Sequence, residues 1–375
     1  ITVNETTCTL INAIRSANTN TSVNGCASGA AGLDTIDLQA DVTLTASYAT
    51  YYGANSGLPL ITEDLIIEGN DHFIDRNASR YYSSGQFRIV TISSGTDVTL
   101  NDVTISDGYI NFFLNGTGIY VNNASLTLNR STVTGNGSFL ANGTIYQKGG
   151  KLIVTDSDIS NNDTRNGGGI FQRGGELRVN GSTFSSNANP GSGGDGGGVH
   201  FEELVGYGPN KAYIENSTFT GNYAYQGGAI FLDGGEMEII QSVISGNKVY
   251  YGRGGGIFQN RGALTIDGTT LDGNLATYYY GGAINLVAGS LELKNSVISN
   301  NESTRYGGGL HVDKWGYANI VNTTFSGNEA DRGGAIAFSG VDDINLPDNT
   351  ILHSTITRNT ANIAGGGLFL EAAGF

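Results

Sequence analysis

Apolar and polar residues alternate with a period of two along most of the chain, in short segments separated by Gly, Asn and Asp turns. Polar neighbours flank the apolar pairs Leu177 and Val179, and Leu264 and Ile266. Because alternate side chains of a strand point to opposite faces, these segments are predicted to be half-buried strands of about four to six residues. An apolar stripe with helical spacing occurs near the start, within 8–18.

The predicted strands recur as parts of one repeated unit. Each unit opens with glycines and an aliphatic residue, passes a second small-residue turn, and closes on Ser or Thr, an apolar residue and Asn, as in GGAIFLDGGEMEIIQSVISGN (227–247). Units of this kind bury their apolar faces by stacking on one another. Most recur after about 25–30 residues, and the aliphatic residues are Ile119, Ile145, Ile170, Val199, Ile230, Ile257, Ile284, Leu310, Ile336 and Leu368.

This repetition predicts the fold class. We expect a single all-β domain, a right-handed parallel β-helix of about 12–13 coils over residues 33–375, with regular repeats from about residue 116 onward. Three short strands and their turns make up each coil.

One asparagine closes each unit. Stacked in register, these amides can hydrogen-bond to one another and to turn backbone. Alternatively, asparagine occurs there because it tolerates left-handed turn geometry. Either role is structural, and the predicted ladder consists of Asn136, Asn161, Asn187, Asn222, Asn247, Asn274, Asn300, Asn328 and Asn359.

The two ends of the predicted solenoid differ. Residues 1–32 are expected to form an N-terminal cap with a short helix over 8–18. In an exported protein a disulfide between Cys8 and Cys26 would fix this cap, whereas in a cytosolic protein both would be free thiols. The segment 363–375 opens a further unit without a comparable cap, so we expect its strand edge to pair with another molecule.

Two motifs carry a resemblance to known families. CTLINAIRSAN (8–18), followed by GLDTIDL (32–38), resembles the CSLREAI-type N-terminal segment of exported parallel β-helix proteins. The repeats are similar to those of polymorphic outer-membrane proteins, whose signatures are GGA-aliphatic and Phe-x-x-Asn. The resemblance implies export, surface display and an adhesive or passenger-type role. The matching segments are 227–230, 281–284 and 333–336 for the first signature, and 184–187, 219–222 and 325–328 for the second.

Charge and composition narrow the function classes. The chain has 34 acidic and 19 basic side chains, giving a formal net charge of −15. Because an acidic surface repels phosphate backbones, no nucleic-acid partner is expected. The apolar runs are too short for a transmembrane helix. No cofactor is expected, and the run GGDGGG (193–198) is the one weak indication of Ca²⁺.

An enzyme is the main alternative. Polysaccharide lyases and hydrolases also use parallel β-helices, and their sites combine carboxylates with basic side chains. Patches of this composition contain His311, Asp313 and Lys314, and His200 with Glu202. Both histidines occupy a position that is aromatic in other units, and four coils, or ~19 Å at the strand spacing, separate them. We therefore expect polar variants of an aromatic column, with no catalytic residues and no metal site.

Tyrosines collect in the turn before the glycines of four successive units. Tyr225, Tyr251, Tyr279 and Tyr306 are the candidate binding residues. Arginines occur in the same turns, and tyrosine with arginine is the composition of contact surfaces. The tyrosines would bind a glycan or a neighbouring rod, or else would stack on each other and stiffen the turn.

Sequons are frequent, and glycosylation is expected if the source has the machinery. The candidates are Asn77, Asn115, Asn123, Asn142, Asn162, Asn180, Asn216, Asn301 and Asn322. Asn136 is also in a sequon, but we expect the ladder to exclude it.

Taken together, the sequence predicts an extracellular or cell-surface protein that is non-catalytic, structural or adhesive. We expect it to self-associate into a filament or sheath through the C-terminal edge, and to contact glycans or other cell-surface molecules. A polysaccharide-active enzyme or a glycan-binding module is the alternative.

Overall fold

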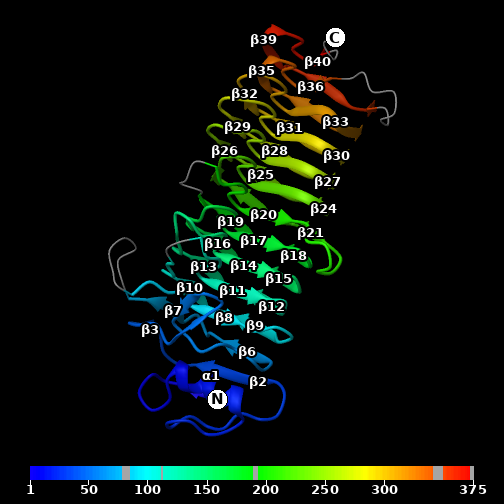
Figure 1. Ribbon diagram of the computed structural model, residues 1–375. Helices are drawn as coiled ribbons and strands as arrows, with labels where there is room; N and C mark the ends of the chain where they lie inside the picture. Colours follow the sequence, from blue (N-terminus) through cyan, green and yellow to red (C-terminus); the bar gives the residue numbers. More distant parts are fainter. Residues whose placement is uncertain (78–84, 111–112, 189–192, 341–348, 372–375) are drawn as a thin grey trace.

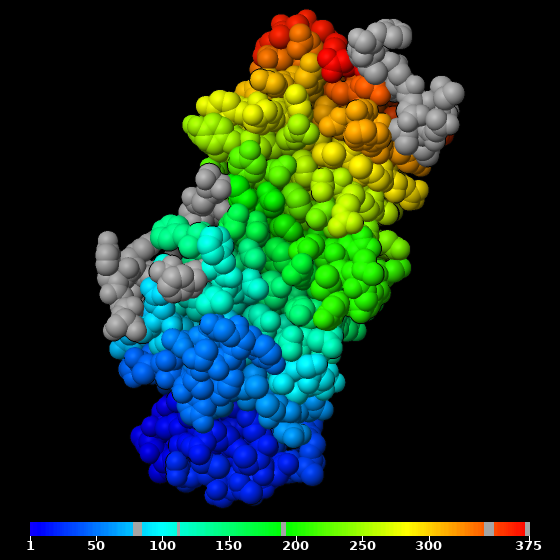
Figure 2. Space-filling view, in the orientation of Figure 1, coloured from blue at the N-terminus to red at the C-terminus, as the bar shows by residue number. Residues whose placement is uncertain are grey.

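The computed structural model is an elongated stack of coils with α1 at one end and β40 at the other (Figure 1). It describes residues 1–77, 85–110, 113–188, 193–340 and 349–371. The space-filling view shows the coils following one another in sequence order from the N-terminal to the C-terminal end (Figure 2). The predicted all-β solenoid is therefore confirmed.

Each coil contributes to a 20-stranded sheet that has two rows of strands. The first row contains β1 (Thr2–Val3), β2 (Asp34–Leu38), β6 (Leu65–Glu68), β9 (Asp97–Asn101), β12 (Ser125–Asn129), β15 (Lys151–Thr155), β18 (Glu176–Asn180), β21 (Lys211–Glu215) and β37 (Thr350–Leu352). The second row contains β8 (Val90–Ile92), β11 (Ile119–Asn122), β14 (Ile145–Lys148), β17 (Ile170–Arg173), β20 (Val199–Glu202), β36 (Ile336–Ser339) and β40 (Leu368–Glu371). Four long strands join both rows: β24 (Ile230–Ile240), β27 (Ile257–Asp267), β30 (Ile284–Lys294) and β33 (Leu310–Val321).

Further sheets complete the coils. A 12-stranded sheet contains β3 (Val42–Leu44), β7 (Phe73–Arg76), β10 (Thr104–Ser106), β13 (Thr132–Thr134), β16 (Asp158–Ser160), β19 (Thr183–Ser185), β22 (Thr218–Thr220), β25 (Val243–Ser245), β28 (Thr270–Asp272), β31 (Val297–Ser299), β34 (Thr324–Ser326) and β38 (Thr355–Thr357). A six-stranded sheet contains β23 (Tyr223–Ala224), β26 (Lys248–Val249), β29 (Leu275–Ala276), β32 (Glu302–Ser303), β35 (Glu329–Arg332) and β39 (Thr360–Ala364). An antiparallel hairpin is formed by β4 (Ala49–Tyr51) and β5 (Ala54–Ser56).

Strands of successive coils pair in parallel and in register, so that equivalent residues stack. Leu126, Leu152 and Leu177 are register partners on β12, β15 and β18, and all three are fully buried. Each such side chain contributes roughly 1.5–3 kcal/mol through burial. Along the 12 strands of the second sheet the chain makes about 11 turns, slightly fewer than the 12–13 coils that the sequence predicted. The period-two pattern therefore supplies one continuous core along the whole rod.

The asparagine ladder exists, but two of its predicted members are wrong. Asn162 and Asn301 fill the positions assigned to Asn161 and Asn300, which are exposed and have left-handed φ values of 54° and 52°. The residues of each Asn–Asn pair fit the sequence pattern equally, and only the register of the coils distinguishes them. Each amide nitrogen donates to the next amide oxygen at 2.9–3.2 Å, through Asn136, Asn162, Asn187, Asn222, Asn247, Asn274, Asn301, Asn328 and Asn359.

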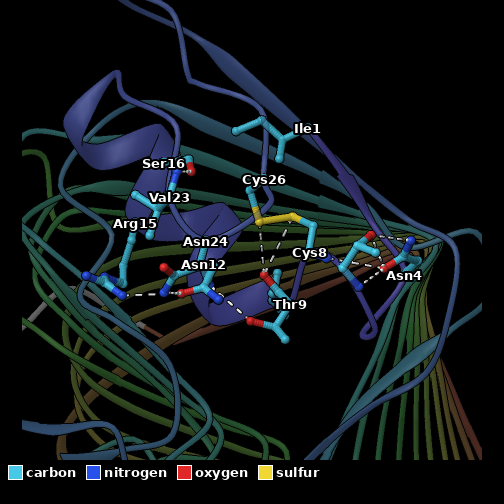
Figure 3. The surroundings of a disulfide bond; sticks show 12 residues. Ile1, Asn4, Cys8, Thr9, Asn12, Arg15, Ser16, Val23, Asn24 and Cys26 are labelled. Carbon is cyan, nitrogen blue, oxygen red and sulfur yellow. Dashed lines mark hydrogen bonds between the residues drawn. A yellow bond between two sulfur atoms is a disulfide. The ribbon is translucent and has the colours of Figure 1, made fainter.

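The N-terminal coil is covered by α1 (Leu10–Thr19), which the sequence placed within 8–18. Thr9 caps this helix by accepting a hydrogen bond from the backbone N–H of Asn12. Cys8 and Cys26 form the predicted disulfide, with their Cα atoms 4.7 Å apart, beside the start of α1 (Figure 3). Among the described residues, no helix is long and apolar enough to cross a membrane.

Candidate functional site

A column of side chains precedes the first glycine of each repeat. These glycines have left-handed φ angles, 60° at Gly227 and 70° at Gly281, and a Cβ at either would lie 2.2–2.3 Å from the carbonyl oxygen of Ile230 or Ile284. Glycine is therefore required, and the residue before it is held in the same place on every coil. This pre-glycine column contains Asn115, Asn142, Asn166, Asp195, Gln226, Arg253, Tyr280, Tyr306 and Arg332.

A second column forms a floor beside it, at the position after the repeat aliphatic residue. This floor column contains Tyr120, Tyr146, Phe171, His200, Phe231, Phe258, Asn285, His311, Ala337 and Phe369. From Tyr120 to Phe258 the rings stack with centroids 4.4–5.4 Å apart and planes within 26° of parallel. Because each ring face covers its neighbour, the floor presents ring edges.

A third column, at the ends of β14, β17, β20 and the first part of β24, forms the opposite wall. Lys148, Arg173, Glu202 and Asp233 are register partners on these strands. Arg173 pairs with Glu202 at 3.3 Å, and Arg261 pairs with Asp233 at 2.8 Å. A cavity of 360 Å³ lies between the two walls, lined by Asn115, Asn142, Tyr146, Asn166, Phe171, Arg173, Asp195, His200, Glu202, Phe231 and Asp233; we call it the polar groove.

Side-chain amides are linked along the pre-glycine wall of this groove. Asn142 donates from Nδ2 to Oδ1 of Asn115 at 3.1 Å, and Asn166 donates to Asn142 at 2.8 Å. The backbone N–H of Asp195 donates to Oδ1 of Asn166 at 2.9 Å, and Gln226 donates to the Asp195 carboxyl at 3.4 Å. These bonds link the wall side chains of five successive coils and fix the orientations of the amides.

Burial sets the charge state of the groove. It raises the pKa of Asp195 to about 7, although the hydrogen bond from Gln226 and the charge of Arg165 oppose the shift. Burial also lowers the pKa of His200 to about 4, so its imidazole is neutral at neutral pH. For Asp233, burial opposes ionisation, but hydrogen bonds from Asn260 and Arg261 bring its pKa below the usual value.

The alternative catalytic residues lie in the next part of the same face, and each of them has a different partner. His311 is 1% exposed and contacts Asn285 at 3.2 Å and Ser339 at 3.0 Å. Burial, and then the charge of Arg253, lower the pKa of His311 to about 3. Asp313 pairs with Arg253 at 3.4 Å, while Lys314 lies over the Trp315 ring at 3.9 Å.

Tyrosine rings cover His311. The ring centroids of Tyr280 and Tyr306 lie 4.7 Å and 5.9 Å from that of His311. Arg253 and Arg332 lie over these tyrosines at 4.8 Å and 5.6 Å. The rings therefore occupy the region over the floor that is open in the polar groove.

Four tyrosines form an exposed cluster, which we call the tyrosine patch. Tyr250, Tyr251, Tyr278 and Tyr279 are 38%, 53%, 44% and 36% exposed. Tyr251 stacks on Tyr278 at 4.9 Å, Tyr250 meets both rings edge-on, and Arg305 lies over Tyr279 at 5.5 Å. Two of the predicted binding residues, Tyr251 and Tyr279, belong to this patch.

The other two predicted binding tyrosines lie elsewhere. Tyr225 and Tyr306 are half-buried, and Tyr306 donates its hydroxyl hydrogen to Glu371 at 3.0 Å. The tyrosines therefore do not form one uniform strip.

The structure corrects two of the glycosylation candidates. Asn162 and Asn301 are fully buried in the asparagine ladder, so glycosylation there in the folded protein is excluded. Asn115 and Asn142 are half-buried in the groove wall, and Asn77, Asn123, Asn180, Asn216 and Asn322 are exposed. No cluster of three or more His, Cys, Asp or Glu side chains suited to a metal ion occurs in the part of the chain that the structure describes.

Comparisons with known proteins agree with the β-helical fold. Residues 203–374 match the family model of a right handed beta helix region, and residues 29–141 match that of a pectate lyase-like adhesive domain. No curated protein and no solved structure matched the chain. The chain is thus a right-handed β-helix repeat protein, as predicted. The finer resemblance, to CSLREAI-type exported proteins and polymorphic outer-membrane proteins, stays a prediction.

Proposed function

We propose that this chain is a non-catalytic adhesive protein of the cell surface, and that the tyrosine patch is its contact surface. The observation that carries the proposal is the exposure of Tyr250, Tyr251, Tyr278 and Tyr279, with the rings of the first three in mutual contact. The match of residues 29–141 to an adhesive domain supports the class of function. The disulfide between Cys8 and Cys26 is compatible with an extracellular location.

The physical basis is the low cost of ordering tyrosine in an interface. A tyrosine ring has two side-chain torsions, so it supplies a large contact area with little loss of conformational entropy. Between Tyr250, Tyr251 and Tyr278, ring–ring contacts at 4.5–5.3 Å restrict these torsions before any ligand binds. A preorganised patch retains more of its interaction energy on binding.

A double substitution tests the proposal. Tyr251→Ser with Tyr279→Ser should reduce adhesion of protein-coated beads to polysaccharide- and protein-coated surfaces by at least about ten-fold. The melting temperature should stay nearly unchanged, because both rings are well exposed. Tyr48→Ser is the matched control, since Tyr48 is 42% exposed but lies outside the patch. Undiminished adhesion of the double variant would show that the tyrosines only stiffen their turns.

The sequence also suggested an enzyme and self-association. The separation of His311, Asp313 and Lys314 into different contacts gives no support to the enzyme. Association of rods into a filament or sheath stays a prediction, and electron microscopy of the purified protein distinguishes filaments from single rods.

A further inference from the structure

We infer that the polar groove binds a short segment of a neutral, linear oligosaccharide lying along the axis of the β-helix. The site is distinct from the tyrosine patch, so this inference does not depend on that patch being adhesive. It assigns a ligand class to the cavity between the pre-glycine wall and the wall of Arg173, Glu202 and Asp233.

The shape of the groove favours an extended ligand. Its wall repeats once per coil, at about 4.8 Å, and presents Asn115, Asn142 and Asn166 in register. A pyranose unit of a linear glycan has a similar length, so successive sugars would meet successive amides. The volume of 360 Å³ lies near the lower end of the range of about 300–1,000 Å³ for small-ligand sites, which limits the bound segment to a few units.

The groove has an end on each side. Toward the N-terminus, Tyr52 of the β4–β5 hairpin stacks on Tyr120 at 5.1 Å. Toward the C-terminus, Tyr280 and Tyr306 cover the floor at His311. The ligand would thus occupy the coils between these two tyrosine contacts.

The charges select against an anionic ligand. Asp195, Glu202 and Asp233 line the cavity together with one basic side chain, Arg173, so the lining is net acidic when Asp195 is ionised and disfavours a carboxylate-bearing polymer. Arg173, the arginine that lines the cavity, is already paired with Glu202. Amides and carboxyl groups together offer both donors and acceptors, which matches the hydroxyl groups of a neutral sugar.

The lining also favours a sugar over a peptide. Nine of the eleven lining side chains carry a polar group, with Phe171 and Phe231 as the exceptions, whereas peptide grooves supply apolar pockets for anchor side chains. The strands β14, β17 and β20 that form the groove are each paired on both sides, so they offer no free edge for strand addition.

Calorimetric titration with defined probes tests the inference. The probes are xylohexaose, cellohexaose and mannohexaose as neutral chains, a galacturonate hexamer as the anionic chain, and a hexapeptide of Ser and Gly. We expect at least one neutral chain to bind and the other two classes to bind at least about ten-fold more weakly, a difference of about 1.4 kcal/mol.

A double variant imitates the filled region of the same face, where Tyr280 and Tyr306 stand in the pre-glycine column. Asn142→Tyr with Asn166→Tyr places in the groove the residue that the fold itself carries at Tyr280 and Tyr306, and should weaken binding by at least about ten-fold. Asn180→Tyr, on the exposed end of β18, should leave binding unchanged. If the double variant does not fold, Asn142→Ala removes an amide without adding bulk and should still weaken binding several-fold.

Several results would overturn the inference. They are the absence of binding by all three neutral chains, tighter binding of the galacturonate or peptide probe, and an equal loss in Asn180→Tyr. The variant Tyr251→Ser with Tyr279→Ser should keep oligosaccharide binding. Undiminished adhesion of this variant with intact oligosaccharide binding would contradict the adhesive patch alone. Loss of adhesion in this variant, together with no binding of any neutral chain by the original protein, would contradict the groove proposal alone.

Discussion

The same face of the β-helix is open over one set of coils and filled over the next. Between Asn115 and Gln226 the pre-glycine wall is built of amides and one carboxyl, while the floor beneath is aromatic. At Tyr280 and Tyr306 the wall is bulky, and the floor is reduced to Asn285, His311 and Ala337. The wall residues are the smaller side chains in the first region and the floor residues are the smaller ones in the second, and the polar groove lies over the first region.

The backbone beside the wall residues is alike in both regions, although β30 and β33 are long continuous strands with a register shift after Leu286, whereas β17 and β20 are short strands. Both regions have left-handed glycines after the wall residue, as at Gly196 and Gly281, and parallel pairing in register. The solenoid therefore fixes where side chains are placed, and the wall and floor residues of each coil together decide whether the face can accept a ligand. Substitutions within these columns should change the groove while the fold is retained.

Opening the filled region should have the largest effect on stability. Tyr280→Asn with Tyr306→Asn removes two rings that contact His311 and two arginines, and also the hydrogen bond to Glu371. We expect a loss of about 3 kcal/mol in the free energy of unfolding, measured in urea, because a cavity replaces packed rings.

Tyr278→Asn provides the comparison for this double variant, since Tyr278 is 44% exposed and lies in the tyrosine patch. It should cost less than about 0.5 kcal/mol. If Tyr278→Asn costs half as much free energy of unfolding as the double variant, the view that Tyr280 and Tyr306 fill a groove is contradicted.

The two floor histidines should respond differently to phenylalanine. His200 stacks between Phe171 and Phe231, so His200→Phe continues the column and should cost little at pH 8. His311 contacts Asn285 and Ser339, and His311→Phe would leave these polar side chains without that partner, at a cost of about 1–3 kcal/mol at pH 8.

The stability of the original protein and that of His200→Phe should also depend differently on pH. The pKa of His200 is about 4 in the folded protein against an ordinary 6.5, so the unfolded chain binds the proton first and stability falls as the pH drops below 6.5. His200→Phe lacks this titration and should exceed the original protein by about 2 kcal/mol at pH 5. Denaturant unfolding at pH 8 and pH 5 measures both effects, and identical pH dependence of the two proteins would contradict the buried neutral state of His200.

The sequence predicted the coils better than it predicted the groove. Period-two segments and the spacing of the repeat aliphatic residues depend on burial of alternate side chains, which every coil must satisfy. The Asn–Asn pairs 161–162 and 300–301 were assigned one residue too early, because either member fits the pattern and only the bonds between coils select one.

The groove was missed for a related reason. Asp195 was noted only as part of a glycine-rich run, Asn115 and Asn142 only as glycosylation candidates, and His200 with Glu202 only as one patch of the enzyme alternative. A signal was present, since these residues directly precede the first glycine of each unit and change from Asn to Tyr along the chain. Whether such a column encloses a cavity depends on the volumes of both wall and floor, which only the stacked structure brings together.

Asp195 offers the finest test of the open region. Because burial raises its pKa to about 7, the folded protein holds the carboxyl protonated at pH 5 and must ionise it in the groove at pH 8. Stability associated with this group is therefore lost as the pH rises through 7, and Asp195→Asn, which cannot ionise, should gain on the original protein between pH 5 and pH 8. We expect a gain of about 1 kcal/mol, smaller than for the enclosed histidines because water in the groove hydrates the carboxylate.

Asp313→Asn is the control in the filled region, where the carboxylate is paired with Arg253, and it should lose stability at pH 8. If Asp313→Asn gains stability relative to the original protein at pH 8, or if Asp195→Asn does not, the proposed electrostatic difference between the open and filled parts of this face is contradicted.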